Sequence, residues 1–432
     1  TDEVVVPEGF QWAPIIAWGD PVLAGAPAFD FDRQSAAAQA GQMGYNCDYV
    51  GVVRTRGQNN AVLVVNNEYT NNNLMFHDYT TAAAMTDDQV QITMNAHGMT
   101  VVEMSRKNPH SKWVYTKGAP LNRRITAETP FELVGPVRGH DLVKTSADPT
   151  GTTPLGTFGN CAGGTTPWGT ILSGEENFNG YFTQPAAPTD DLVGQAAKRY
   201  GLAGGSKSQH NWDRLDQRFD LTQEPNEAHR HGWIIEVDPS DPTSTPRKLT
   251  ALGRMKHEGA NVVIARDGRV VAYMGDDERF DYVYKFVTAG RFDPNNRSAN
   301  LDLLDSGTLY VFSGTGADKL RELTEVAMDE MRRAAEGFAP EEIERARAQM
   351  RAGLLMGLET PSDRREWLAR GVATRDRLPD IDEVLGRIAA VTAEDVRRVA
   401  GEVISGAGPA VSLLGPIGSA PRRALLAERL AA

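Results

Sequence analysis

The sequence predicts a mainly β portion followed by an α+β portion, with the boundary near residue 312. Short apolar runs separated by turn residues fill the first portion, whereas apolar residues recur at helical spacing in the second. All 20 asparagines lie at or before residue 300, and every tyrosine and histidine lies before residue 312. This change of composition indicates two modules, residues 1–312 and 313–432. A single protein with a helical tail is the alternative, because helices disfavour Asn and Gly.

The first module is predicted to consist of short strands bounded by turns. Asp267-Gly268 predicts a hairpin with a type I′ turn, in which both central residues need φ > 0. Many short strands with few helices are typical of a sandwich, a barrel or a propeller. The polar stretch 184–222 is expected to cross the surface outside the core. The apolar runs that we assign to strands are 61–65, 113–115, 232–237, 261–265, 270–274, 282–287 and 308–312.

The second module has the apolar spacing and the capping residues of helices. Thr360 and Thr392 are each followed three residues later by a carboxylate, so both are expected to cap a helix. Residues 410–414 follow Gly-Ala-Gly-Pro and are expected to form a closing strand, which makes the module α+β. The helical sets are Leu320, Leu323, Ala327 and Met331; Ile343, Ala346, Met350 and Leu354; and Ile381, Val384, Leu385 and Ile388.

Composition and motifs exclude several classes of protein. With 45 Lys and Arg against 57 Asp and Glu, the net charge of −12 argues against a nucleic-acid partner. No apolar run is long enough for a membrane helix, and the opening TDEVVVPEGF lacks an initiator Met and a signal peptide, as in a mature protein. The two cysteines, Cys47 and Cys161, provide no CxxC zinc site. GxSxG, the P-loop motif, HExxH and HxxEH are also absent.

The densest group of reactive residues lies in GNCAGGTTPWGTILSGEEN, residues 159–177. Cys161 precedes a Gly-Gly pair that lets backbone approach a ligand closely, and Glu175 and Glu176 follow a short apolar run. A thiolate and carboxylates on neighbouring loops can bind a transition metal. A buried Cys161 acting as a small apolar residue, or a disulfide to Cys47, is the alternative.

Four further groups of residues offer metal ligands. Adjacent His and Glu can supply a ligand and its orienting partner, and clustered acids supply the oxygen ligands that Ca²⁺ prefers. Two histidines one residue apart share a face if they lie on a strand. An exposed pair on a strand edge, a solvated acidic turn or a plain turn is the alternative in each case. The groups are His257 with Glu258, Asp276 with Asp277, Glu68 among asparagines, and His229 with His231.

Several segments, taken in order, resemble the PhoX alkaline phosphatases over about residues 5–311. They are VPEGFQW, NNEYTNNNLMF, GNCAGGTTPWGTILSGEENF, RHGWIIEVDP, ALGRMKHEGANVVIARDGRVVAYMGDD and FDYVYKFV. The resemblance implies a β-propeller, export to the periplasm or the medium, and hydrolysis of small phosphomonoesters. It also implies a cofactor of Fe³⁺ and Ca²⁺ ions and no zinc site.

The same resemblance implies roles for particular residues. Cys161 would be an iron ligand and Glu258 a metal-bridging carboxylate, so these two are the catalytic candidates. Glu175 or Glu176 would bind metal or support a ligand, and the weaker metal candidates are His257, Asp276, Asp277 and Glu68. A multi-metal centre neutralises the charge that spreads over the phosphoryl oxygens in the transition state.

Two departures from the PhoX pattern matter. Asn67 stands where the family has His, and nothing after residue 312 resembles the later blades with their acidic ligands. The resemblance therefore implies a partial, unclosed propeller whose open edges need cover. An inactive chain is one expected outcome, and a non-catalytic Ca²⁺-binding propeller module is the alternative function.

The tail resembles the C-terminal part of M16 domains, of the insulinase and processing-peptidase type, over about residues 313–428. The similar segments are SGTGADKLRELTEVAMDEMRRAAEGFAPEEIERARAQMRAGLLMGLETPSDRREWLARGV and IAAVTAEDVRRVAGEVI. Since the zinc motif HxxEH is absent, this portion would be an α+β half without protease chemistry. An inactive accessory subunit whose tail contacts an M16-like partner is therefore a further alternative. No membrane partner is expected.

Overall fold

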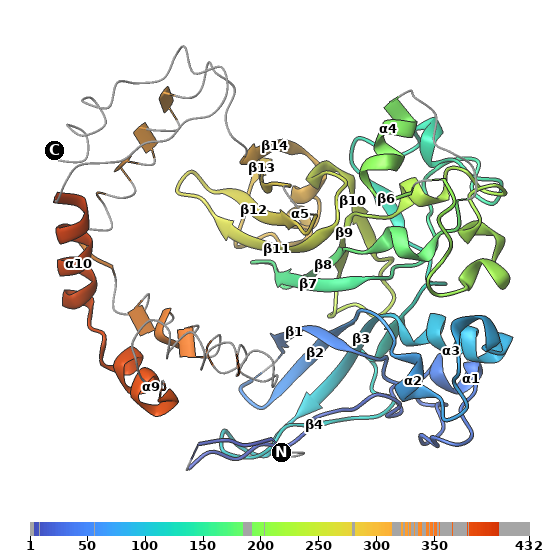
Figure 1. Ribbon diagram of the computed structural model, residues 1–432, viewed down its shortest axis with the longest axis horizontal. Helices are drawn as coiled ribbons and strands as arrows, with labels where there is room; N and C mark the ends of the chain where they lie inside the picture. The colour runs from blue at the N-terminus through green and yellow to red at the C-terminus, as the bar shows by residue number, and fades with distance from the viewer. Residues whose placement is uncertain are drawn as a thin grey trace. The chain divides into compact units, whose positions relative to one another are not determined.

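The computed structural model describes residues 4–7, 9–55, 57–184, 192–202, 204–278, 281–312 and 380–405, with scattered positions between 321 and 378 (Figure 1). The chain divides into two compact units, Thr1–Ser313 and Gly314–Ala432. The first unit contains three β-sheets, and helices α9 and α10 lie in the second. Mainly β structure before residue 312 is therefore confirmed.

The three sheets are mostly antiparallel. The first has the order β1-β2-β3-β4, with β5 also pairing with β3. The second has the order β6-β10-β9-β8-β7, in which β10 and β6 are parallel, and the third runs β11-β12-β13-β14 in chain order. The strands are β1 (Cys47–Arg54), β2 (Asn60–Asn67), β3 (Gly98–Ser105), β4 (Val114–Tyr115), β5 (Arg123–Ile125), β6 (Glu132–Val134), β7 (Asn160–Thr165), β8 (Ile171–Glu175), β9 (Ile234–Val237), β10 (Arg247–Leu249), β11 (His257–Ile264), β12 (Arg269–Asp276), β13 (Val283–Arg291) and β14 (Gly307–Phe312).

Helices are short, and in the first unit most of them lie in connections between strands of the same sheet. Thr86 caps α3 through a capping box with Gln89, a pattern that is visible in the sequence. The α-helices are α1 (Ala36–Gln39), α2 (Asn72–Met75), α3 (Asp87–Ala96), α4 (Leu192–Arg199), α5 (Arg297–Asn300), α9 (Ile381–Ala390) and α10 (Ala393–Ser405). The 3₁₀ turns are η1 (Ala82–Ala84), η2 (Asp141–Val143), η3 (Phe178–Tyr181), η4 (Trp212–Arg214), η5 (Gln217–Phe219), η6 (Glu227–Arg230), η7 (Thr250–Leu252) and η8 (Leu303–Asp305).

The sheets pack in succession through two apolar layers. One layer lies between the first and second sheets and includes Val64 and Ile235, and the other lies between the second and third sheets and includes Leu172 and Phe286. Each layer removes aliphatic side chains from water, which is the main driving force for this arrangement. Among the described residues the sheets form an open array, so the expected propeller is not confirmed.

Glycines allow the second and third sheets to approach closely beside β7 and β8. A Cβ atom on Gly164 would lie 1.9 Å from the carbonyl oxygen of Ala260, and one on Gly174 would lie 2.2 Å from that of His257. Both distances are shorter than any real contact, so only glycine fits at these two positions. As a result β11 lies against β7, as Figure 1 shows.

The stretch 184–222, which was expected to lie outside the core, contributes to it. Trp212 and Phe219 are fully buried, and they pack with Phe158 and Tyr181 in the largest apolar cluster of the described residues. The prediction was wrong because it relied on average polarity. A few large aromatic residues decide burial here, since each buries much more area than the polar residues around it.

The hairpin between β11 and β12 is confirmed, but the predicted turn type is wrong. Gly268 has φ +83°, whereas Asp267 does not have a positive φ. The amide of Gly268 donates to the carbonyl of Ala265 at 2.9 Å, and the amide of Ala265 donates to Arg269 at 2.8 Å. This is a turn with one left-handed glycine, in which a bulge joins the turn to the second strand.

In the second unit, α9 covers the residues expected to be helical at 381–388, and α10 has the cap expected at Thr392. The hydroxyl of Thr392 accepts from the amide of Asp395 at 3.1 Å, and the amide of Thr392 donates to the Asp395 carboxylate at 2.9 Å. Asp380 caps α9 through the amides of Asp382 and Glu383. The cap expected at Thr360 and the strand expected at 410–414 lie outside the described residues.

Candidate metal centre

Three hairpins, one in each sheet, share the same geometry at their open ends. In β1-β2, β7-β8 and β11-β12, two residues of the first strand oppose a single residue of the second. Such a bulge turns a side chain out of the regular alternation of a strand. In each hairpin the bulge directly follows the first paired residue of the first strand. The first residues of the three bulges are Asp48, Cys161 and Glu258.

The second strand of each hairpin supplies an equivalent acidic residue. The residue paired just before each bulge is the last residue of β2, β8 or β12, namely Asn67, Glu175 or Asp276. The chain then leaves the sheet, and the next residue carries a carboxylate. The three residues at this position are Glu68, Glu176 and Asp277.

These side chains converge on Cys161. One ligand atom from each of Asp48, Glu68 and Cys161 lies within 4.8 Å of the others, and the same holds for Cys161, Glu176 and Glu258. The sulfur of Cys161 lies 3.7 Å from Oδ2 of Asp48. We use the name donor cluster for Asp48, Glu68, Cys161, Glu176, Glu258 and Asp277.

Burial, together with nearby carboxylates, shifts the pKa values of four members of the donor cluster. Burial, together with the charges of Glu176 and Asp48, raises the pKa of Glu68 to about 8. Burial and a hydrogen bond with Asp277 raise the pKa of Glu176 to about 7. Burial and the nearby carboxylates also raise the pKa of the Cys161 thiol, and burial with Asp277 raises that of Glu258. The cluster therefore lacks a positive charge that would stabilise its ionised state.

The donor set fits a mixed metal centre. In the described part of the chain, no lysine or arginine forms an ion pair with any of the six side chains. Five carboxylates offer the oxygen ligands that suit Ca²⁺, and one thiolate favours a transition metal. The fit to iron and calcium therefore rests on the chemistry of these donors and on their unbalanced negative charge.

Neighbouring polar groups hold the cluster in place. The side-chain amide of Asn66 donates to the carbonyl oxygen of Cys161, which joins the first sheet to the second beside the thiol. Asn177 donates to Oε1 of Glu176 at 2.8 Å. The hydroxyl of Tyr181 donates to the carbonyl oxygen of Glu68 at 3.3 Å. Such partners orient ligands and keep their geometry in the absence of the ion.

Glu175, a candidate ligand in the sequence, lies outside the donor cluster. Its Oε1 accepts from Lys248 at 2.7 Å, and its Oε2 accepts from the amides of Gly232 and Trp233 at 3.0 and 3.2 Å. Burial opposes ionisation of Glu175, but the Lys248 charge and the hydrogen bonds outweigh it and lower its pKa to about 2. Its carboxylate already has a cation, so its role here is structural.

Asp276 and His257 are also not brought into the donor cluster. Asp276 forms an ion pair with Arg199 of α4 at 3.2 Å, and Arg199 pairs with Asp281 as well. His257 is fully buried, and its Nε2 lies 2.8 Å from the carbonyl oxygen of Gly253. His257 and Asp276 are paired with each other across the hairpin, before its bulge. Glu258 begins the bulge and Asp277 follows the end of β12, so neither keeps the regular alternation of the strands.

The structure contradicts the two remaining sequence hypotheses. Cys47 and Cys161 are both free thiols, so the alternative of a disulfide between them is excluded. His229 lies in η6 and not on a strand, and His231 follows it at the end of that turn. His231 lies between Glu175 and Glu227, 3.5 Å from each. The expectation of two histidines on one strand face was therefore wrong.

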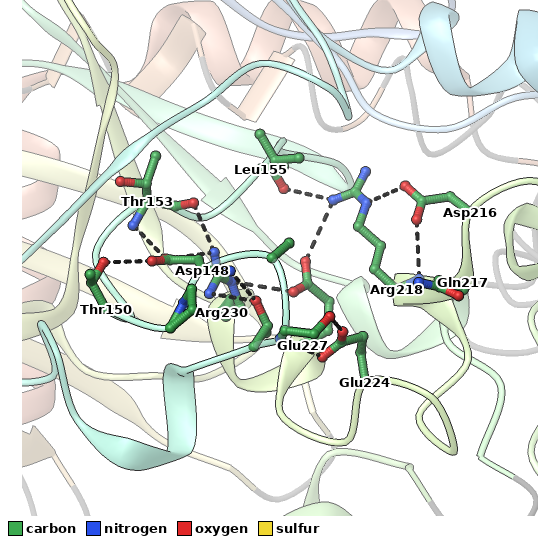
Figure 2. Close-up of a pocket in the computed structure, with 14 residues that line it drawn as sticks. Asp148, Thr150, Thr153, Leu155, Asp216, Gln217, Arg218, Glu224, Glu227 and Arg230 are labelled. Carbon is green, nitrogen blue, oxygen red and sulfur yellow. Dashed lines mark hydrogen bonds and ion pairs between the residues drawn. The ribbon is translucent and has the colours of Figure 1, made fainter.

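A separate cavity of about 530 Å³ lies at Arg218 and Arg230 (Figure 2). Arg230 pairs with Asp148 at 3.1 Å and Arg218 with Glu227 at 3.5 Å. Both guanidinium groups also donate to backbone carbonyls. Because these two cations are already paired, the cavity offers no free positive charge to a phosphate. The donor cluster is therefore the stronger candidate for chemistry.

Comparison with known proteins agrees with a phosphatase-like hydrolase on a β scaffold. The family model described as alkaline phosphatase PhoX matches residues 1–376, beyond the end of the resemblance at about residue 311. The chain belongs to the PhoX alkaline phosphatase family. Among solved structures it resembles Pseudomonas fluorescens PhoX in complex with vanadate, a transition-state analogue. The two are 43% identical with a TM-score of 0.66, and the match covers 71% of this chain and 52% of that one.

A second set of relatives is similar to about a quarter of the chain. An uncharacterized zinc protease of Streptomyces coelicolor is 31% identical over 114 residues, which are 26% of this chain and 25% of that protein. A protein named probable mitochondrial-processing peptidase subunit beta, from Arabidopsis thaliana, is 32% identical over 122 residues, 28% of this chain and 23% of that protein. The chain thus spans about a quarter of these relatives and about half of the PhoX structure. None of its described helices is long and apolar enough to cross a membrane.

Proposed function

We propose that this chain is a metal-dependent phosphomonoester hydrolase whose metal ions are held by the donor cluster. The observation that carries the proposal is the repeated hairpin geometry. Three hairpins present six potential ligands at equivalent positions, and the sulfur of Cys161 belongs to both groups that could hold an ion. Membership of the PhoX family supports the choice of reaction.

Fe³⁺ and Ca²⁺ are the proposed ions, and a periplasmic or secreted location is proposed from the family. Bound ions would neutralise the negative charge of the phosphoryl group. The residues of this chain supply the negative charge that holds such ions. Cys161 and Glu68, whose pKa values are raised in the metal-free protein, lose protons when they bind metal, so loading should release protons.

The test uses the full chain, loaded with Fe³⁺ and Ca²⁺, and measures phosphate release from phenyl phosphate together with the iron content. The decisive variant is Cys161→Ala, because its thiol lies at the centre of the cluster. Cys47→Ala is the matched control, since Cys47 is an exposed free thiol. We expect the wild type and Cys47→Ala to bind iron and release phosphate, and Cys161→Ala to do neither.

Three outcomes would contradict the proposal. Equal phosphate release by Cys161→Ala and the wild type would place the chemistry elsewhere. Calcium binding without iron and without phosphate release would favour the alternative, a non-catalytic Ca²⁺-binding module. Iron binding without phosphate release would show that the described half of the family fold forms the centre but not an active enzyme.

A further inference from the structure

A cleft of about 480 Å³ lies directly beside the donor cluster. Glu68 belongs to both, and Asn177 lines the cleft while its side chain donates to Glu176 of the cluster. The volume falls within the roughly 300–1,000 Å³ that small-molecule sites occupy. A phosphate ester with its phosphoryl group at the cluster would therefore have its organic part in this cleft.

The cleft is lined by carboxamide side chains and a tyrosine ring. Asn72, Asn179 and Gln209 line it, and the Gln209 amide lies over Gly180, with its carbon 3.5 Å from where a Cβ atom would be. No hydrogen bond joins the side-chain amides of Asn179 and Gln209 to another described residue. Carboxamides both donate and accept hydrogen bonds, which is what a hydroxyl group requires.

Charge in the cleft limits which ligands it can take. Among its described lining residues there is no lysine or arginine, so a second phosphate would have no cation to contact. His210 stacks on the Tyr181 ring with centroids 4.2 Å apart, and burial lowers the pKa of His210 to about 4, so it is neutral. Tyr69, which is 43% exposed, offers a ring face at the rim.

We propose that this cleft binds the uncharged, hydroxyl-rich leaving group of the substrate, so that the preferred esters are monophosphates of sugars and polyols. The inference rests on the proposed function, because it assigns the phosphoryl group to the donor cluster. Its own evidence is different: the shared position of Glu68, the side-chain amides of Asn179 and Gln209 without a hydrogen-bond partner, and the absence of Lys and Arg from the described lining residues.

Two measurements on the full chain test the proposal separately from the activity. The first is the ratio of kcat/KM for glucose 6-phosphate to that for phenyl phosphate, in the metal-loaded protein. The second is binding of methyl glucoside, detected by saturation-transfer NMR, which needs no turnover. The variant is Gln209→Leu, with Asn179→Ala as a second one, and the control is Gln223→Ala, an exposed amide outside the cleft.

We expect the wild type and Gln223→Ala to prefer glucose 6-phosphate and to bind the glucoside. Gln209→Leu and Asn179→Ala should lose about three- to tenfold in kcat/KM for the sugar ester, the range for one lost hydrogen bond, with less than a twofold change for phenyl phosphate. If Gln209→Leu does not fold, the kcat/KM ratio and the glucoside binding of Asn179→Ala test the proposal.

Equal kcat/KM for the two esters, a preference for a nucleoside monophosphate, or no glucoside signal would each overturn the proposal. Failure of the proposed function looks different. No ester would then be hydrolysed, while glucoside binding and its loss in Gln209→Leu would still support a sugar site in the cleft.

Discussion

Glu175 and Glu176 are neighbours in the chain, yet their environments are opposite. Glu175 is fully buried against Lys248 and two backbone amides, and its pKa is lowered to about 2. Glu176 faces Cys161 and other carboxylates, and its pKa is raised to about 7. The charge of Glu175 is balanced within the protein by Lys248, whereas the charge of Glu176 needs a cation from outside the protein.

The same division recurs in the third sheet. Asp276 pairs with Arg199, while the next residue, Asp277, contacts the donor cluster. In each pair of acids, the last residue of the strand pairs with a cation of the protein, and the residue that follows the strand lies in the candidate centre. A cation supplied by the protein marks the structural residue, and its absence marks the candidate ligand.

The largest expected effect is on stability, from breaking the Glu175–Lys248 pair. Glu175→Gln should cost about 3–5 kcal/mol, because it leaves the Lys248 ammonium buried without a counter-charge. Glu176→Gln should leave the metal-free protein as stable or more stable, since it removes a repelled charge. Urea unfolding in the presence of a chelator measures both. A loss below about 1 kcal/mol for Glu175→Gln would contradict the assignment.

The donor cluster should instead couple stability to metal. Saturating metal at one hundred times its dissociation constant should stabilise the wild type by about 2.7 kcal/mol per site. Glu258→Gln should lose most of this gain, because its carboxylate lies in the group with Cys161 and Glu176. Glu128→Gln, an exposed acid elsewhere, is the control. Equal metal-induced shifts in melting temperature for the two variants would argue against the cluster.

Sequence reasoning found most of the donor cluster without its arrangement. Glu68, Cys161, Glu176, Glu258 and Asp277 were candidates, and the structure brings their side chains together. The sequence could not separate Glu175 from Glu176, because two adjacent acids look alike until the strand and its partner are known. The cations that pair with Glu175 and Asp276 lie far away in the chain, at Lys248 and Arg199.

Asp48 was missed, although a signal for it exists. Asp48 follows Cys47, and Cys47 pairs with Asn67, which Glu68 follows. In the second sheet, Cys161 and Glu176 likewise follow the paired residues Asn160 and Glu175. Aligning the three hairpins on their bulges would have found it. The apolar runs of β2 and β12 were predicted as strands, whereas β1, β3 and β7 were missed. The Gly-Gly sequence of β7 has no apolar pattern.

The contact between β7 and β11 connects the two halves of the donor cluster, so it should be sensitive to one added methyl group. Gly164→Ala would place a Cβ atom 1.9 Å from the Ala260 carbonyl oxygen and force the strands apart. We expect a loss of about 1–3 kcal/mol in stability and weaker iron binding, because Cys161 and Glu258 lie on these strands. Gly25→Ala, which meets nothing within 4 Å, is the control. Unchanged iron binding would separate the cluster from this contact.

A further expected effect is a pH dependence that has opposite signs at the two sites. In the metal-free folded protein, the pKa values of Glu68 and Glu176 are about 8 and 7, against an ordinary value of 4.5. Between pH 4.5 and these raised values, the folded state therefore binds more protons than the unfolded state. Stability should therefore fall as the pH rises from about 4.5 through 8.

Glu175 gives stability the opposite pH dependence, because its pKa of about 2 lies below the ordinary value of 4.5. Its contribution is fully present above pH 4.5 and is lost as the pH falls through about 2. Urea unfolding from pH 5 to 9 in a chelator should thus show declining stability in the wild type and a flatter curve in Glu68→Gln. Bound metal should remove the decline, because the cation supplies the charge that the cluster lacks. A wild-type curve that stays flat without metal would show that burial and the nearby charges do not raise the pKa values of Glu68 and Glu176.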